Sequence, residues 1–391
     1  MSTAYILSAC RTPIGRFQGD FASVAAPDLA AVAIREAIRR TGLLVAEVDE
    51  VILGHVLSAG VGQAPARQAA LRAGLPATVA ACSVNKVCGS GLKAVMLADQ
   101  AIRSGDVKLV VAGGMESMSR CGWLLRRGQR ALGDQQLTDW MLHDGLTCAM
   151  TGHSMGAIAE QLAARAKISR PTQDRFALES HRRAIEAIDA GAFAEEIVPV
   201  AVNTKNGAIE ISNDSGPRRE TTLEQLAELR PVFGKEGTVT AGNASMISDG
   251  AAAVVVADAS VAERSVVHPL CRIVATATSG GAPEDLFTAP VAAIREVVRK
   301  AGQSLQEIDL FEINEAFAVQ MIACIDQLDI PHSRVNIHGG AIALGHPIGA
   351  SGARVLVTLL NALQRHEKRL GIAALCLGGG NAVAMLVDRE I

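Results

Sequence analysis

Hydrophobic runs alternate with amphipathic stretches along this chain, and one series of such segments occurs twice. Residues 34–42 (IREAIRRTG) return as residues 294–302 (IREVVRKAG), and each copy leads through a Glu-hydrophobic-Asp triplet into an apolar run. Further on, GLKAV at 91–95 resembles GARVL at 352–356, and a long apolar run follows in both copies. Apolar runs of strand length between amphipathic helices predict mostly parallel strands covered on both faces. We therefore predict an α/β protein with a duplicated sheet unit.

The stretch between the two copies differs from both of them. Residues 119–235 combine a long helical pattern at 172–190 with a polar segment at 203–220. Insertions of this length usually carry binding residues. The apolar run at 251–256 then predicts a buried strand that returns to the first sheet. We divide the chain accordingly into a first domain at 1–118 plus 236–270, an inserted loop domain at 119–235 and a second domain at 271–391.

Composition restricts the partners and the compartment. A formal charge of −3 over 391 residues gives no electrostatic basis for binding nucleic acid or an anionic membrane, and no apolar run reaches membrane-spanning length. The eight cysteines form no metal-like Cys-x-x-Cys pair and no secretory signal is evident, so we expect reduced thiols, a cytoplasmic location and no metal. Only 3% of residues are aromatic while 37 are glycine, which predicts closely packed backbones.

Three glycine-rich turns each present a reactive side chain, and the first holds Cys88. The sequence NKVCGSG at 85–91 precedes the amphipathic stretch 92–102, so we expect Cys88 at a strand-to-helix turn. Unpaired N–H groups and the positive end of the helix dipole favour a thiolate there, which predicts a lowered pKa and a nucleophilic sulfur. The alternative is a small buried hydrophobic residue.

The other two turns hold His346 and Cys376. His346, in the segment GHPIG, could deprotonate a thiol and later stabilise an oxyanion, or it could be a structural or capping histidine. Cys376 ends an apolar run and opens onto three glycines whose N–H groups could face a ligand; the alternative is a core cysteine. Asn314 follows another apolar run, where its amide either orients a water or an enolate, or caps a helix starting near Glu315.

Two thiols, a base and backbone N–H donors are the groups needed to acylate a thiol and to form or break a carbon–carbon bond beside a carbonyl. Six segments match thiolase signatures in order, and over nearly its whole length the chain resembles that family: residues 11–15, 85–95, 241–251, 314–318, 339–354 and 376–380. The resemblance implies an α/β thiolase fold, with duplicated βαβαβαββ domains in five αβαβα layers and an inserted loop domain that binds coenzyme A.

The resemblance also implies an acyltransferase with a ping-pong mechanism, converting two acetyl-CoA to acetoacetyl-CoA plus CoA. Cys88 would accept the acyl group with His346 as its base, and Cys376 would exchange the α-proton. Asn314 would act through a water, with His346, on the enolate oxygen, while the N–H groups of Cys88 and Gly378 would hold the other oxyanion. Coenzyme A and acyl-CoA would be substrates, with no permanently bound cofactor.

For coenzyme A, the resemblance places Arg218 near the nucleotide and Ser245 near the pantetheine. The alternative for Arg218 and its neighbour Arg219 is a solvated loop. The family also implies homodimers that pack edge to edge through the first domain and often pair into a dimer of dimers, a homotetramer.

The acyl pocket departs from the short-chain biosynthetic pattern in two places. Ser154, before Met155, stands where those enzymes commonly have a histidine, and Leu286-Phe287 replaces their Met-Gly lining. The Phe287 ring would either narrow the site or turn outward and leave it to Leu286 and Met155. Cleavage of longer 3-ketoacyl-CoAs in fatty acid metabolism therefore stays open beside acetoacetyl-CoA formation.

Two other classes share the scaffold that this resemblance implies. A decarboxylating ketoacyl synthase has a nucleophilic cysteine, but the Cys376 segment and the run NEAF at 314–317 favour a thiolase. A non-catalytic acyl-CoA-binding or lipid-binding protein would have no need for all four reactive side chains.

Overall fold

The computed structural model describes residues 3–128, 134–205 and 207–390. Ten of its strands form one mixed sheet in the order β12-β13-β14-β11-β1-β10-β5-β3-β4, with β2 beside β10. The first half holds β1 (Tyr5–Arg11), β2 (Gly15–Arg16), β3 (Glu50–Gly54), β4 (Ala80–Val84), β5 (Leu109–Ser117) and β10 (Ser248–Ala257). The second half holds β11 (Cys271–Gly280), β12 (Leu310–Ile313), β13 (Leu370–Leu377) and β14 (Asn381–Asp388).

The prediction of mostly parallel strands is wrong. The parallel pairs are β3 with β4, β3 with β5, and β12 with β13, whereas β1, β10, β11 and β14 pair with their main neighbours antiparallel. The unbroken apolar runs arise because helices cover both faces of each half, which buries antiparallel strands as fully as parallel ones. The predicted return of a buried strand to the first sheet is confirmed, since β10 lies between β1 and β5.

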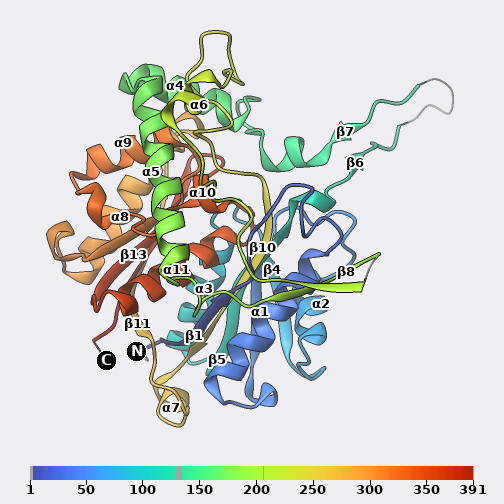
Figure 1. Ribbon diagram of the computed structural model, residues 1–391. Helices are drawn as coiled ribbons and strands as arrows, with labels where there is room; N and C mark the ends of the chain where they lie inside the picture. Colours follow the sequence, from blue (N-terminus) through green and yellow to red (C-terminus); the bar gives the residue numbers. More distant parts are fainter. Residues whose placement is uncertain (1–2, 129–133, 206, 391) are drawn as a thin grey trace.

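Helices form three layers around the two halves of the sheet. α1 (Ala26–Thr41) and α2 (Pro65–Arg72) pack on the outer face of the first half. α8 (Ala289–Ala301) and α9 (Ala318–Leu328) cover the outer face of the second. Between the halves lie α3 (Ser90–Ser104) and α11 (Ser351–Arg365), which contact each other and strands of both (Figure 1). The five-layer αβαβα arrangement is therefore confirmed.

The central layer brings two backbones into direct contact. A Cβ atom built on Gly352 would lie 2.3 Å from the Leu92 nitrogen, and one on Gly91 would lie 2.7 Å from the Ala353 nitrogen. These distances leave no room for any side chain at either position. The low aromatic content and the many glycines of the sequence thus correspond to a central layer in which α3 and α11 touch backbone to backbone.

The segment between β5 and β10 contributes helices and short hairpins. It holds β6 (Trp123–Leu124), β7 (Thr138–Asp139), α4 (Met155–Ala166), α5 (Arg170–Asp189), β8 (Val200–Thr204), β9 (Gly207–Ile211) and α6 (Leu223–Glu228). The arm carrying β6 and β7 projects away from the rest of the molecule (Figure 1). The helix predicted at 172–190 is confirmed as α5, and residue 206 of the polar segment lies outside the described residues. Two single-turn α-helices lie elsewhere in the chain, α7 (Ala259–Ala262) and α10 (Ala341–Leu344).

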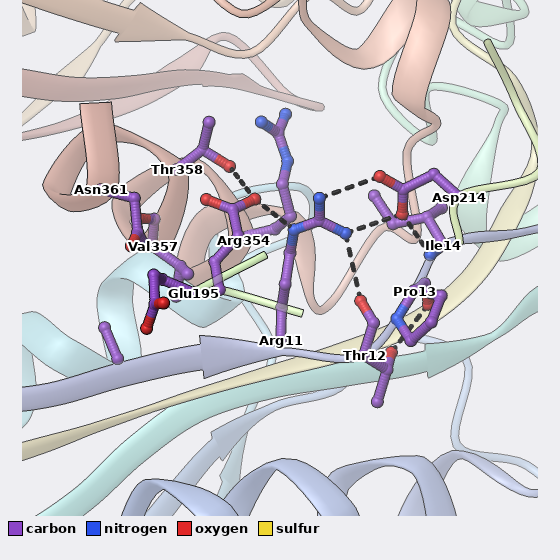
Figure 2. A network of polar contacts seen from close by, with 12 residues as sticks. Arg11, Thr12, Pro13, Ile14, Glu195, Asp214, Arg354, Val357, Thr358 and Asn361 are labelled. Carbon is purple, nitrogen blue, oxygen red and sulfur yellow. Dashed lines mark hydrogen bonds and ion pairs between the residues drawn. The ribbon is translucent and has the colours of Figure 1, made fainter. Parts of the chain in front are cut away.

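A buried polar network joins the first strand, the inserted segment and the central layer (Figure 2). Arg11 Nε donates to Glu196 Oε1 at 2.6 Å, and its two terminal nitrogens donate to Asp214. Thr358 of α11 also donates to Glu196, at 3.2 Å. Parts of the chain far apart in sequence are therefore fixed to one another next to the RTPIG segment.

Within the described residues, no helix is both long and apolar enough to cross a bilayer. The same residues contain no group of three or more His, Cys, Asp and Glu side chains that could hold a metal ion.

Candidate active site

One cavity of about 750 Å³ gathers most of the predicted site. Its wall includes ten of the eleven residues singled out from the sequence: Cys88, His346, Cys376, Gly378, Ser154, Met155, Arg218, Ser245, Leu286 and Phe287. They come from the first half, the inserted segment and the second half of the chain. A single cavity therefore holds the two thiols, the imidazole and the groups expected to contact coenzyme A.

Cys88 lies at the predicted strand-to-helix turn, between β4 and the first residue of α3. The turn is strained, because Val87 has a positive φ of 47°, a conformation that a β-branched side chain rarely adopts. Hydrogen bonds hold it in place: Asn85 Oδ1 accepts the Val87 N–H at 3.0 Å, and Ser90 Oγ donates to the Val87 carbonyl at 2.6 Å. Strain of this kind is found where a side chain must be presented in one direction.

The prediction of a lowered Cys88 pKa is wrong. Burial raises the pKa of the Cys88 thiol to about 11, and the nearby Glu116 carboxylate adds to the rise. The N–H groups of Gly378 and of Cys88 itself oppose it. These two N–H groups do not offset the loss of water around the sulfur, so Cys88 carries its proton at neutral pH.

His346 follows α10 in a turn fixed by backbone contacts. Its N–H donates to the Met246 carbonyl at 2.9 Å, and its Nδ1 atom lies 2.5 Å from Ser351 Oγ. Burial and the charge of Arg354 lower the pKa of His346 to about 3, so the imidazole is neutral. A neutral imidazole on the wall of the same cavity as a protonated thiol has the protonation state that a general base needs before the proton moves.

Glu116 of β5 anchors the turn of His346 to the first half of the sheet. Its Oε2 atom accepts the N–H of Gly349 at 2.9 Å and that of Val56 at 3.1 Å, and Oε1 accepts the N–H of Leu57 at 3.2 Å. One buried carboxylate therefore fixes the histidine turn of the second copy to the ends of β3 and β5 in the first.

Cys376 lies at the carboxyl end of β13 and is almost fully buried. Burial, together with the neighbouring thiols of Cys88 and Cys324, raises the pKa of Cys376. The backbone N–H of Gly378, two residues on, acts on the sulfur of Cys88. The two cysteines of the sequence analysis are thus neighbours, and both are protonated at neutral pH.

Asn314 is completely buried and is the one selected residue that is not among the described residues lining the cavity. Its alternative role as a helix cap is wrong, since α9 begins only at Ala318 with Phe317 as its N-cap. Neither atom of its amide has a hydrogen-bond partner among the described residues. Both polar atoms of the side chain are therefore available to a buried water.

Phe287 forms part of an apolar wall of the cavity near Cys376. Its ring is 3% exposed and packs edge-on against Phe317, with 5.2 Å between the ring centres. Leu286 is equally buried, and both belong to one hydrophobic cluster with Cys376. The ring of Phe287 therefore lies inside the protein, at the cavity.

The residues expected to contact coenzyme A lie in the inserted segment and just after it. Arg218 is exposed at the cavity, and its guanidinium makes no hydrogen bond to any residue that the structure describes, whereas Arg219 pairs with Asp189 at 2.6 Å. Ser154 caps α4 by accepting the Ala157 N–H, and Ser245 donates its N–H to Ala316. Arg218 is thus the arginine still available to a ligand.

Sequence reasoning missed several residues that line or support the cavity. Arg16, Phe17, His181, Phe233 and Met246 are all at its wall, and Glu116 and Ser351 hold the histidine turn. His181 accepts the Arg218 N–H through Nδ1 at 3.2 Å, and burial lowers its pKa to about 4. Its position in a long amphipathic helix gives no sign of this role, because the pattern of a helix shows which face is buried but not what it meets.

Comparison with known proteins gives consistent results at three levels. Residues 4–260 match the N-terminal domain of thiolase, and residues 267–389 match its C-terminal domain. The acetyl-CoA acetyltransferase of Escherichia coli K12 is 51% identical over the full length of both chains, and that of Pseudomonas aeruginosa is 48% identical, also over both full lengths.

Two solved structures of thiolases also resemble this chain over nearly its full length. The Bacillus anthracis acetyl-CoA acetyltransferase superposes with a TM-score of 0.97 at 40% identity and covers 99% of each chain. Human mitochondrial 3-ketoacyl-CoA thiolase gives a TM-score of 0.96 at 38% identity over 100% of this chain and 99% of that one. The duplicated five-layer fold, the cavity and these matches lead to one conclusion: the chain belongs to the thiolase family.

Proposed function

We propose that this chain is an acetyl-CoA C-acetyltransferase, which condenses two acetyl-CoA into acetoacetyl-CoA and CoA and catalyses the reverse thiolysis. The observation that carries the proposal is the placing of Cys88, His346 and Cys376 on one cavity wall. Full-length identity of about half to relatives named acetyl-CoA acetyltransferases supports the choice of substrate. Coenzyme A and its thioesters are substrates here.

The thiolysis direction begins at Cys88. Its sulfur attacks the keto carbonyl of acetoacetyl-CoA while the thiol proton passes to His346, and the N–H groups of Cys88 and Gly378 stabilise the oxyanion. The carbon–carbon bond then breaks, and its electrons move to the enolate of acetyl-CoA. Cys376 donates its proton to the α-carbon, which releases acetyl-CoA and leaves an acetyl group on Cys88.

The second half-reaction restores both thiols. Coenzyme A gives its thiol proton to the Cys376 thiolate and takes the acetyl group, while Cys88 recovers a proton from His346. Condensation is the reverse of these steps. Asn314, acting through a water with His346, would stabilise the enolate oxygen, and its unpaired buried amide supports that role.

The roles of the two thiols can be tested by separating the half-reactions. Cys376→Ser should still transfer acetyl from acetyl-CoA to Cys88, detected as an acetylated peptide by mass spectrometry, but should lose α-proton exchange and condensation. Cys88→Ala should lose both, and Cys82→Ser, a change at an exposed cysteine outside the cavity, should keep both. Equal loss of both half-reactions in folded Cys376→Ser would contradict separate roles.

For the assembly we propose a homodimer, paired into a tetramer in the cytoplasm, with residues 1–118 plus 236–270, 119–235 and 271–391 as the structural units. β4 supports the dimer, because it is the outermost strand of the first half and its side chains are only partly buried. The projecting arm supports the tetramer, since Trp123, Leu125 and Leu137 each expose more than half of their surface there. Light scattering of the intact chain would test both steps.

A further inference from the structure

Two short contacts fix the position of Ser351 beside the imidazole of His346. Ser351 is the first residue of α11, and its Oγ atom lies 2.5 Å from His346 Nδ1 and 2.8 Å from the Pro347 carbonyl oxygen. Ser351 is completely buried and His346 nearly so. Solvent therefore does not compete for either contact.

The number of protons available determines which nitrogen of the ring is protonated. Ser351 Oγ lies at hydrogen-bond distance from both the Pro347 carbonyl oxygen and His346 Nδ1. Each of these two hydrogen bonds needs its own proton. The proline carbonyl has none to give and the serine hydroxyl has one. If the hydroxyl donated to Nδ1, two bare oxygens would face each other at 2.8 Å. The hydroxyl therefore donates to Pro347, and the second proton lies on Nδ1.

The duplicated copy of this turn shows the same polarity. Ser90, the first residue of α3, holds the corresponding place before the echoed segment of the first half. Its Oγ donates to the Val87 carbonyl at 2.6 Å and accepts the Lys86 N–H at 2.8 Å. A backbone N–H can only donate, so Ser90 donates to a carbonyl of its own turn and accepts from a second group, the same division inferred for Ser351.

We propose that Ser351 is a positioning residue that holds His346 with its proton on Nδ1, so that Nε2 presents the lone pair that takes the Cys88 proton. The proposal rests on the proposed function. When the S–H bond of Cys88 breaks, its electron pair forms the bond to the acyl carbon and the proton bonds to Nε2. The imidazolium keeps its Nδ1–H bond to Ser351, which stabilises the charge until the proton returns.

The helix makes this support rigid. A hydroxyl that donates to the carbonyl four residues earlier is a common arrangement for serine in helices, so the contact to Pro347 fixes the side chain by backbone geometry. Next to Ser351, Gly352 packs against the backbone of Leu92 in α3 with no space for a side chain. The oxygen that accepts from His346 is therefore held by the central layer itself.

The test compares three variants of the full-length protein. Ser351→Ala should lower kcat for acetyl transfer from acetyl-CoA by roughly 10- to 100-fold with little change in KM, which is the loss typical when a group that orients a metal-ligating histidine is removed. Ser351→Thr keeps the hydroxyl and should recover most of the rate. Thr358→Val, which removes another buried hydroxyl of α11, should keep wild-type acetyl transfer. A Ser351→Ala rate within twofold of wild type would overturn the proposal.

A spectroscopic measurement decides the tautomer independently of activity. In ¹⁵N-histidine spectra, with His346 assigned by its loss in His346→Gln, the wild type should show a protonated Nδ1 and a bare Nε2, and Ser351→Ala should shift toward a mixture. A bare Nδ1 in the wild type would overturn the proposal even if Ser351→Ala is inactive or unfolded. If the wild type shows no acetyl transfer, the proposed function fails, while the spectra still report on Ser351.

Discussion

Arg11 and Asp214 form a bidentate ion pair, with 2.7 Å between Nη1 and Oδ1 and 2.9 Å between Nη2 and Oδ2, and both side chains are almost fully buried. Asp214 also accepts the Ile14 N–H at 2.7 Å. The pair therefore fixes the inserted segment to the end of the first strand, next to the cavity.

Loss of the Arg11 side chain should strongly lower the free energy of unfolding. Arg11→Met leaves Glu196 and Asp214 buried without their cation, which typically costs about 3–5 kcal/mol of unfolding free energy. Arg72→Met is the matched control, because its pair with Asp28 is about half exposed and should contribute less than about 1 kcal/mol. Urea unfolding of both variants gives the comparison. Similar small losses in the two would show that the buried pair adds nothing.

Alkylation of Cys88 should depend steeply on pH. Only the thiolate reacts, and with the pKa of Cys88 raised to about 11 the thiolate fraction grows about tenfold per pH unit from pH 7 to pH 10. The rate constant for iodoacetamide, followed by mass spectrometry of the Cys88 peptide, should rise accordingly, and acetyl-CoA should protect. A rate that is already constant below pH 8 would mean that the turn lowers the pKa after all.

The preference of the enzyme for the acyl chain length of its substrate should depend on Phe287. Removing its ring in Phe287→Ala extends the acyl end of the cavity, and each methylene that gains burial is worth roughly 0.8 kcal/mol, or about fourfold in kcat/KM. We expect six-carbon and eight-carbon 3-oxoacyl-CoAs to gain relative to acetoacetyl-CoA. Phe176→Ala, which removes a buried ring elsewhere, controls for general loosening and should leave the ratio unchanged. An unaltered profile in folded Phe287→Ala would show that the ring does not limit the site.

The adjacent residues Arg218 and Arg219 allow a controlled test of coenzyme A binding, with Arg219 as the control. Arg218→Ala should raise KM for acetyl-CoA about tenfold, as expected for loss of a partly exposed contact to a charged group, because its guanidinium is at the cavity and has no described protein partner. Arg219→Ala only breaks an exposed pair with Asp189 and should change KM little. With S-acetyl-N-acetylcysteamine, which lacks the nucleotide, Arg218→Ala should match wild type. An equal effect on both substrates would place Arg218 away from the nucleotide.

The sequence predicts those features of the fold and the site that are determined by short segments and by internal repeats. The repeat shared by α1 and α8, and the turn that carries Cys88, can each be recognised from short stretches of the sequence. Strand direction does not, since an apolar run has the same pattern whichever way its partner points. The pKa of Cys88 was predicted with the wrong sign because it depends on burial by residues far along the chain. Ser351 and Glu116 were missed for the same reason: their partners lie across turns that only the fold assembles.

The backbone contacts of Gly91 with Ala353 and of Gly352 with Leu92 also bear on how the molecule unfolds. α3 and α11 form one layer shared by both halves, so neither half has a complete hydrophobic core without the other. Chains with separate cores can lose them one at a time, whereas a shared layer couples their loss. We therefore expect the two halves to melt together, in a single calorimetric transition, even though the chain carries two copies of the same unit.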